Sequence, residues 1–169
     1  MLSRASKRYL MVGDKLPNIT LPYITSSGLE MTSVHSLFSS KKSLVIGHPG
    51  AFTKFSTNSQ VPDFQKALPE LSEKFDQVLC LSVNDPFELG HWKQKYGIQL
   101  NMLCDFKGDL TRVLELGLPD TEFFSFCCKR TLVIIKDTKV LGVSAENSVQ
   151  YTEKTTPEAA LKLYNSVFN

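Results

Sequence analysis

Residues 43–64, SLVIGHPGAFTKFSTNSQVPDF, form the stretch that decides the fold. Residues 43–47 are a short apolar run, which is typical of a central strand covered on both faces. A turn-like segment, 48–53, follows, and apolar residues then recur every three or four positions, which predicts a helix over 56–75 that Pro69 should kink or divide. The predicted helix begins at the carboxyl end of a strand, where open α/β sheets place their ligands.

Working outward, short β runs alternate with helical stretches. Pro22 should push the first strand to an edge of the sheet, and Thr156 followed by Pro157 is a strong helix start. This order predicts an α/β fold, a thioredoxin-like three-layer α/β/α sandwich around a mixed sheet. The other predicted strands are 18–24, 78–83, 101–104, 130–135 and 140–144, and the other predicted helices are 34–38, 87–96, 109–116 and 157–168.

The composition fits one globular domain, which we expect over residues 12–169. Hydrophobic residues make up 42% and charged residues 21% of the 169 residues, which excludes a disordered or fibrous chain. The net charge of +2 argues against nucleic-acid binding, and no apolar run is long enough to span a membrane.

Residues 1–11 form a basic leader that carries Arg4, Lys7 and Arg8 and no acidic residue. This composition is typical of a mitochondrial targeting segment, and a solvated N-terminus is the alternative interpretation. The expected location is mitochondrial in the first case and cytoplasmic in the second.

Four cysteines occur without a CxxC motif or zinc-ligand spacing, so we expect no metal and no bound cofactor. Cys80 and Cys104 lie in apolar runs and are predicted to be buried small hydrophobic residues. His35, His48 and His91 share no metal spacing and are predicted to be structural histidines with satisfied hydrogen bonds.

Several motifs, in the correct order over most of the chain, resemble the peroxiredoxins. The resemblance is to the atypical two-cysteine class that includes the fifth mammalian type and the plant type II enzymes. The segments that carry it are VGDKLPNITLPYI (12–24), PGAFT (49–53), LCLSVNDPF (79–87) with HW (91–92), LCDFKGDL (103–110) and CKRTLVII (128–135).

The resemblance implies a site made of Pro49, Thr53, Arg130 and a peroxidatic cysteine three residues after Thr53. Ser56 occupies that last position here, and Lys54 and Phe55 stand where the family commonly has proline or another small residue. The family reduces hydroperoxides through a cysteine sulfenic acid, draws electrons from thioredoxin or glutaredoxin, and often forms homodimers. A serine hydroxyl cannot replace a thiolate in that reaction.

Three hypotheses follow from Ser56. The chain is an inactive structural or accessory subunit, in a mitochondrial assembly, or it is an active thiol peroxidase seen as a Cys-to-Ser mutant. Alternatively, it is a module that binds a small anion with Thr53 and Arg130. Lys54 and Phe55 favour natural divergence, because a single engineered substitution would not change them.

Two further groups of residues have a structural and a functional interpretation. Cys127 and Cys128 lie in the general region where some members of this class carry a resolving cysteine, but they have no sulfenic acid to resolve at position 56. Phe123, Phe124 and Phe126 pack internally or form an apolar contact with a second copy or a larger protein assembly.

Overall fold

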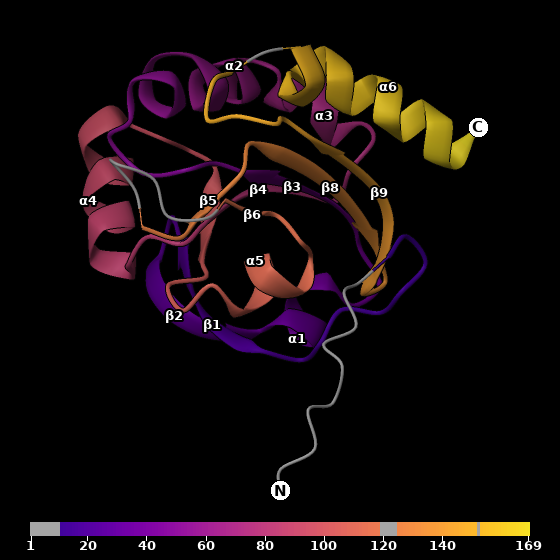
Figure 1. Ribbon diagram of the computed structural model, residues 1–169, viewed down its shortest axis with the longest axis horizontal. Coiled ribbons are helices and arrows are strands. Elements are labelled where there is room, and N and C mark those ends of the chain that lie inside the picture. The colour runs from indigo at the N-terminus through magenta and orange to yellow at the C-terminus, as the bar shows by residue number, and fades with distance from the viewer. Residues whose placement is uncertain (1–10, 119–124, 152) are drawn as a thin grey trace, which may run out of the picture.

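The structure is a computed structural model that describes residues 11–118, 125–151 and 153–169. Residues 1–10 of the predicted leader, and Phe123 and Phe124, lie outside the described residues. The main sheet has seven strands in the order β2-β1-β5-β4-β3-β8-β9, with helices on both faces (Figure 1). This arrangement confirms the predicted three-layer α/β/α fold.

The strands of the main sheet are β1 Thr20–Thr25, β2 Gly28–Ser33, β3 Lys42–Gly47, β4 Gln77–Ser82, β5 Asn101–Cys104, β8 Thr131–Lys136 and β9 Lys139–Ala145. A two-stranded ribbon pairs β6 Gly117–Leu118 with β7 Cys127–Cys128. The α-helices are α1 Val34–Phe38, α2 Val61–Lys66, α3 Leu68–Ser72, α4 Pro86–Tyr96, α5 Asp109–Val113 and α6 Pro157–Phe168. A π-helix, η1 Ser56–Gln60, precedes α2, and a 3₁₀-helix, η2 Glu153–Thr155, precedes α6.

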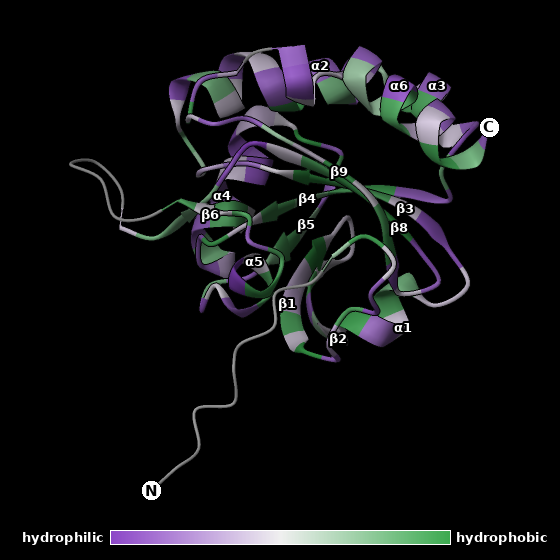
Figure 2. Cartoon of the chain, turned by 45° about the vertical axis from the view of Figure 1, so that its right-hand side comes forward, coloured by the Kyte–Doolittle hydropathy of each residue, from purple (hydrophilic) through white to green (hydrophobic). Residues whose placement is uncertain are grey.

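The middle of the sheet is mixed because β3 pairs in parallel with β4 and antiparallel with β8. Successive residues of β3 point to opposite faces. Leu44 and Ile46 therefore join the core under α2, α3, α4 and α6, whereas Val45 joins the core under α1 and α5. Figure 2 shows the central strands as an apolar layer, and burial on both faces fixes the end of β3 firmly in place.

One local prediction is confirmed and another is wrong. The helix predicted over 56–75 is divided, as expected from Pro69, into η1, α2 and α3, with the break at Ala67, because Pro69 has no N–H for the carbonyl four residues earlier. Pro22 does not make β1 an edge strand. β1 lies between β2 and β5, and β5 pairs only with Tyr23 and Ile24, so the missing N–H of Pro22 falls outside that pairing.

The strand at this edge of the sheet is β2, which was not predicted, and β9 forms the other edge. The first four residues of β2 are all exposed, so the sequence has no alternation of buried and exposed positions to reveal it. The β6–β7 ribbon was also missed, because each of its strands has only two residues.

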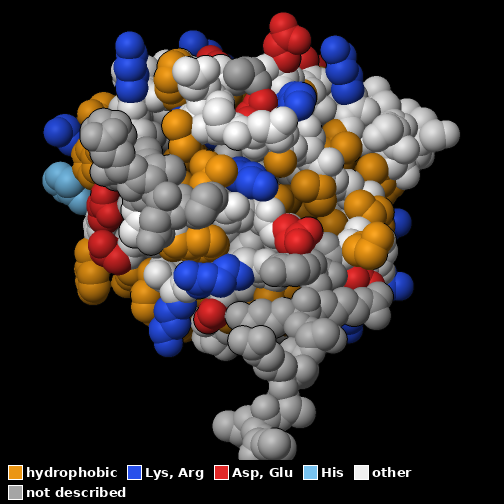
Figure 3. Space-filling model, in the orientation of Figure 1, with side chains coloured by type: hydrophobic (Ala, Val, Ile, Leu, Met, Phe, Trp, Pro, Cys, Tyr) orange, Lys and Arg blue, Asp and Glu red, His pale blue; other side chains and the backbone are white. Residues whose placement is uncertain are grey.

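The described surface has mixed charge. Figure 3 shows basic and acidic side chains interspersed over the face drawn there, without one continuous basic stripe. Within the described ranges, no helix has the length and hydropathy of a membrane span.

Candidate functional site

The carboxyl end of β3 brings together the two chain segments that the sequence singled out. Gly47 pairs with Thr131 across the antiparallel ladder, so His48 and Arg130 lie at the same end of adjacent strands. A side chain at Gly47 would collide with Thr131 Oγ1 and lie 2.9 Å from Cys128 Sγ. Glycine therefore lets β8 and the segment before it approach β3 closely.

The loop from His48 to Phe55 is held in a defined shape. The N–H of Ala51 donates to Asn84 Oδ1 at 3.1 Å. Phe52 has a left-handed backbone with φ 59°, and its ring lies 5.9 Å from the ring of His91 and 6.1 Å from that of Tyr96. Pro49 is buried in this turn, and it makes no polar contact with another described residue. The loop thus delivers Thr53 and Ser56 to the end of β3.

The predicted site residues Thr53, Ser56 and Arg130 form one hydrogen-bond network. Arg130 Nη1 donates to Ser56 Oγ at 3.1 Å. Thr53 Oγ1 lies 2.9 Å from the carbonyl oxygen of Gly50 and shares a 2.7 Å hydrogen bond with Ser56 Oγ. A carbonyl can only accept, so Ser56 supplies the proton of the shared bond whenever Thr53 donates to Gly50.

Gln60 completes the network, and its part in the site was not predicted. Its side-chain Oε1 accepts from Arg130 Nη1 at 2.5 Å, and its Nε2 donates to the carbonyl oxygen of Gly47 at 3.1 Å. Arg130 Nε also donates to the carbonyl oxygen of Val149 at 2.6 Å. The only sequence signal for Gln60 is its position four residues after Ser56, which places both on one side of a helical turn.

The inner part of this network is closed to solvent, whereas Thr53 is only partly buried. Ser56 and Gln60 are 0% exposed and Arg130 is 1% exposed. The ring of Phe55 lies 5.8 Å from Arg130 Cζ and is itself 38% exposed, so it sits between the guanidinium and the surface. The Phe55 ring therefore forms a cover over this side of the site.

The buried guanidinium has no carboxylate in hydrogen-bond contact among the described residues. Its partners are a hydroxyl, an amide oxygen and a backbone carbonyl oxygen. Burial lowers the pKa of Arg130 to about 10, and Tyr151 and Glu146 offset part of that effect through their charges. Arg130 therefore remains a cation at neutral pH and gives the pocket a positive potential.

His48 contradicts the prediction of satisfied structural histidines. The ring is fully buried 5.1 Å from the ring of Trp92, and neither ring nitrogen has a hydrogen bond of good geometry among the described residues, although the backbone of Gly50 lies near the ring. Burial, together with the charge of Arg130, lowers the pKa of His48 to about 3, and the backbone of Gly50 opposes this shift only slightly, so the ring is neutral. By contrast, His35 Nε2 lies 2.7 Å from the carbonyl oxygen of Leu16, and His91 is exposed.

All four cysteines are buried free thiols. Burial raises the pKa of Cys80, Cys104 and Cys128 to about 12, and raises that of Cys127 despite the opposing effect of Arg130. Cys80 and Cys104 lie in the main core, as predicted. None of the four thiols hydrogen-bonds to Ser56 in the described part of the chain, which also holds no His/Cys/Asp/Glu cluster suited to a metal ion.

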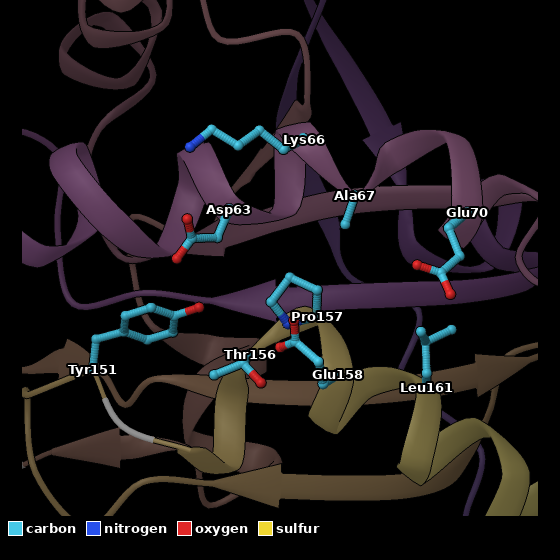
Figure 4. Close-up of a pocket in the computed structure, with 9 residues that line it drawn as sticks. All are labelled: Asp63, Lys66, Ala67, Glu70, Tyr151, Thr156, Pro157, Glu158 and Leu161. Atoms are coloured by element: carbon cyan, nitrogen blue, oxygen red, sulfur yellow. The ribbon is translucent and has the colours of Figure 1, made fainter.

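A separate groove of about 400 Å³ lies between α6 and the α2–α3 segment (Figure 4). Carboxylates of Asp63, Glu70 and Glu158 line it, and the Tyr151 hydroxyl points toward Asp63. Burial, followed by the charge of Asp63, raises the pKa of Tyr151. The groove contains none of the predicted site residues, so we place the candidate chemistry at the closed network and not here.

A thioredoxin-like sandwich with a Thr–Ser–Arg network at the end of β3 defines a redoxin-type protein. The redoxin family model matches residues 11–161. Peroxiredoxin-2D of Arabidopsis thaliana is 33% identical over 149 residues, which cover 85% of this chain and 91% of that protein. The chain belongs to the peroxiredoxin family.

Solved structures agree with this assignment. Reduced Prx3 from Vibrio vulnificus in complex with H₂O₂ has a TM-score of 0.83 at 26% identity, covering 92% of this chain and 96% of that one. Peroxiredoxin 5 from Alvinella pompejana has a TM-score of 0.78 at 25% identity, covering 93% and 99%. The resemblance predicted from the motifs is therefore confirmed at the level of the family.

Proposed function

We propose that this protein is a peroxiredoxin-family member without peroxidase activity, in which Ser56 stands at the position of the reactive cysteine. The observation that carries the proposal is the placement of Ser56 Oγ between Thr53 and Arg130, 2.7 Å and 3.1 Å from their polar atoms. These two residues are the ones that the family resemblance assigns to the peroxide pocket.

The chemistry of the site supports inactivity. In the thiol reaction, sulfur attacks one peroxide oxygen, the O–O bond breaks, the cysteine becomes a sulfenic acid, and the other oxygen leaves and takes up a proton. The hydroxyl of Ser56 is a much weaker nucleophile than a cysteine thiolate. Its hydroxyl contacts a threonine hydroxyl and a guanidinium, and neither group removes a proton at neutral pH.

No other thiol offers a substitute. The most exposed of the four cysteines, Cys127, is only 4% exposed, and burial raises its pKa, so it is a poor source of thiolate. Residual activity from a relocated nucleophile is therefore not expected.

The test is hydroperoxide consumption by the natural protein, with thioredoxin and glutaredoxin systems as electron donors. We expect no turnover above the protein-free reaction. The sequence of the natural gene is the matching control, because a cysteine codon at position 56 would support the alternative of an active peroxidase. Brisk turnover by the serine protein would overturn the proposal.

We also propose a structural or accessory role, in a mitochondrial assembly. The support is the basic leader and the existence of a relative, Peroxiredoxin-2F, mitochondrial, from Arabidopsis thaliana, which is 29% identical over 140 residues. Exposed aromatic side chains near the pocket, namely Phe55 and the pair Phe52 and Tyr96 with ring centres 6.1 Å apart, support association with a second copy or another protein. Co-sedimentation with larger complexes from fractionated organelles tests both parts, and exclusively cytosolic monomer would refute them.

A second candidate function is the binding of a small anion in the same pocket. It is favoured by Arg130, a cation that is 1% exposed and whose hydrogen-bond partners in the described part of the chain are all neutral. Calorimetry with sulfate should show weaker binding by Arg130→Gln and tighter binding by Phe55→Ala, which opens the cover. Equal affinities in wild type and Arg130→Gln would exclude this function.

A further inference from the structure

A second concentration of positive charge lies where β3 begins and β8 turns into β9. Lys42 on β3 pairs directly with Lys136 on β8, and Lys136 pairs directly with Lys139 on β9. An isolated bridge then joins Lys139 to Lys15. Four lysines thus occupy consecutive positions across four adjacent segments. Like charges opposite one another destabilise a sheet, so this arrangement of lysines has a cost in stability.

Aromatic rings hold three ammonium groups together at this place. The rings of Tyr164 and Phe168 on α6 lie 4.6 Å apart, and Lys42 Nζ lies 5.7 Å from the centre of each. Lys74 Nζ is 5.8 Å from the Tyr164 ring, and Lys136 Nζ is 5.8 Å from the Phe168 ring. Lys74 and Lys42 contact the same ring, Tyr164, and Lys136 and Lys42 both contact Phe168. The ammonium groups of Lys74 and Lys136 therefore each lie within about 12 Å of Lys42 Nζ. We call Lys42, Lys74 and Lys136 with these two rings the lysine–aromatic cluster.

The ammonium groups have no acidic partner. Among the described residues, none of the three lysines forms an ion pair with a carboxylate. The neighbouring carboxylates are turned to backbone groups: Asp76 Oδ2 accepts from the N–H of Lys42 at 2.7 Å, and Asp137 Oδ1 accepts from that of Ser40 at 3.1 Å. These two carboxylates keep their negative charges and offset part of the three ammonium charges, so the cluster keeps a smaller net positive charge at a partly fixed geometry.

We propose that the lysine–aromatic cluster is a binding site for an anion that carries several phosphate groups. Lysine is a compact point charge suited to phosphate, whereas bidentate carboxylate recognition favours arginine. Lysine is also depleted from protein–protein interfaces, which argues against an acidic protein surface as the occupant. The ammonium groups already surround the two rings, with Lys42 Nζ at the edge of Tyr164, 3.5 Å from its hydroxyl oxygen. The phosphates, and not an aromatic base, would therefore make the contacts. Such an anion comes either free in solution or as the head group of an inositol phospholipid.

The test compares two triple variants of the full chain with the same change in net charge. Lys42→Gln/Lys74→Gln/Lys136→Gln removes the cluster, and Lys66→Gln/Lys95→Gln/Lys107→Gln is the control. The control is closely matched, because Lys95 and Lys107 also lie over aromatic rings, those of Phe52 and Phe106.

The probe is inorganic tripolyphosphate, titrated by calorimetry at low ionic strength. We expect the cluster variant to bind at least about tenfold more weakly than wild type, and the control to change less than about twofold. Thermal unfolding without the probe should show that the cluster variant is folded, since removal of opposing like charges does not destabilise the sheet. No binding by wild type, or an equal loss in the control, would overturn the proposal.

Vesicles distinguish the two sources of the anion. Flotation with phosphatidylcholine vesicles that contain phosphatidylinositol bisphosphate, lost in the cluster variant, identifies a lipid head group. Binding of tripolyphosphate without flotation identifies a free polyphosphate. Tighter binding of a polyglutamate peptide than of tripolyphosphate would refute a phosphate site and indicate an acidic protein partner.

Discussion

A thiol placed at position 56 should titrate near its ordinary range even though the site is fully buried. The perturbation is Ser56→Cys, which exchanges oxygen for sulfur within the contacts of Thr53 and Arg130. Two opposing effects decide the pKa of the new thiol: loss of hydration raises it, and the guanidinium lowers it.

The magnitudes nearly cancel. Burial raises the pKa of Cys80 from 9.0 to about 12, which corresponds to about 4 kcal/mol. A unit charge at the 3.1 Å distance of Arg130 contributes about 5 kcal/mol in the opposite direction at an effective dielectric constant of about 20. The thiol pKa should therefore lie about one unit below the starting value of 9.0.

Thiolate absorbance during a pH titration measures this pKa. Ser56→Cys/Arg130→Gln is the control, because loss of the cation should leave burial unopposed and raise the pKa above about 10. A pKa above about 10 in Ser56→Cys itself would show that Arg130 does not activate the position.

Reaction with hydrogen peroxide tests the cover as well as the charge. We expect Ser56→Cys to react slowly, because Phe55 shields Arg130 and Ser56 is 0% exposed. Adding Phe55→Ala should accelerate the reaction at least about tenfold, which is about 1.4 kcal/mol of barrier. A full family-level rate in the single variant would contradict our interpretation of the loop.

Three other predictions concern stability. The pKa of His48 is lowered from 6.5 to about 3, so the folded state binds fewer protons than the unfolded state, and the free energy of unfolding falls as the pH drops from 6.5 towards 3. Urea unfolding at pH 7 and pH 4.5 should show that His48→Leu removes about 2–3 kcal/mol of that fall, and the same fall in wild type and variant would refute this role of His48. Lys93 donates to the carbonyl oxygens of residues 98, 99 and 100 at 2.7, 3.1 and 2.7 Å, so Lys93→Met should cost about 2–4 kcal/mol and Lys95→Met less than about 0.5, a ranking that urea midpoints would check. Gly47→Ala should cost about 3 kcal/mol by forcing β8 from β3, and a wild-type unfolding midpoint would disprove the close approach.

The sequence predicted those elements whose burial requires a recognisable run or periodicity of apolar residues. The apolar runs of β3 and β4 and the start of α6 at Thr156 and Pro157 were placed to within about one residue. β2 was missed because its exposed residues follow no alternation, and its strand form depends on pairing with β1. Non-local pairing overrides local signals of this kind.

The sequence predicted which residues form the site, but not how they are covered or which other side chains contact them. The family resemblance assigned Thr53, Ser56 and Arg130 to one site. The pairing of Gly47 with Thr131 explains how Arg130 comes close to the other two residues. The closed state could not be predicted, because it depends on the Phe55 ring and on the amide of Gln60. Both act through tertiary contacts that no spacing along the chain reveals.

The π-helical turn from Ser56 to Gln60 makes the pocket sensitive to chain length as well as to residue identity. The N–H of Val61 reaches back five residues to the carbonyl of Ser56, one residue more than an α-helix allows. Deleting a single residue between them would restore ordinary α-helical winding and rotate Ser56 by about 100° relative to α2. A shortened turn of this kind would turn the hydroxyl away from the guanidinium while every side chain of the network is retained.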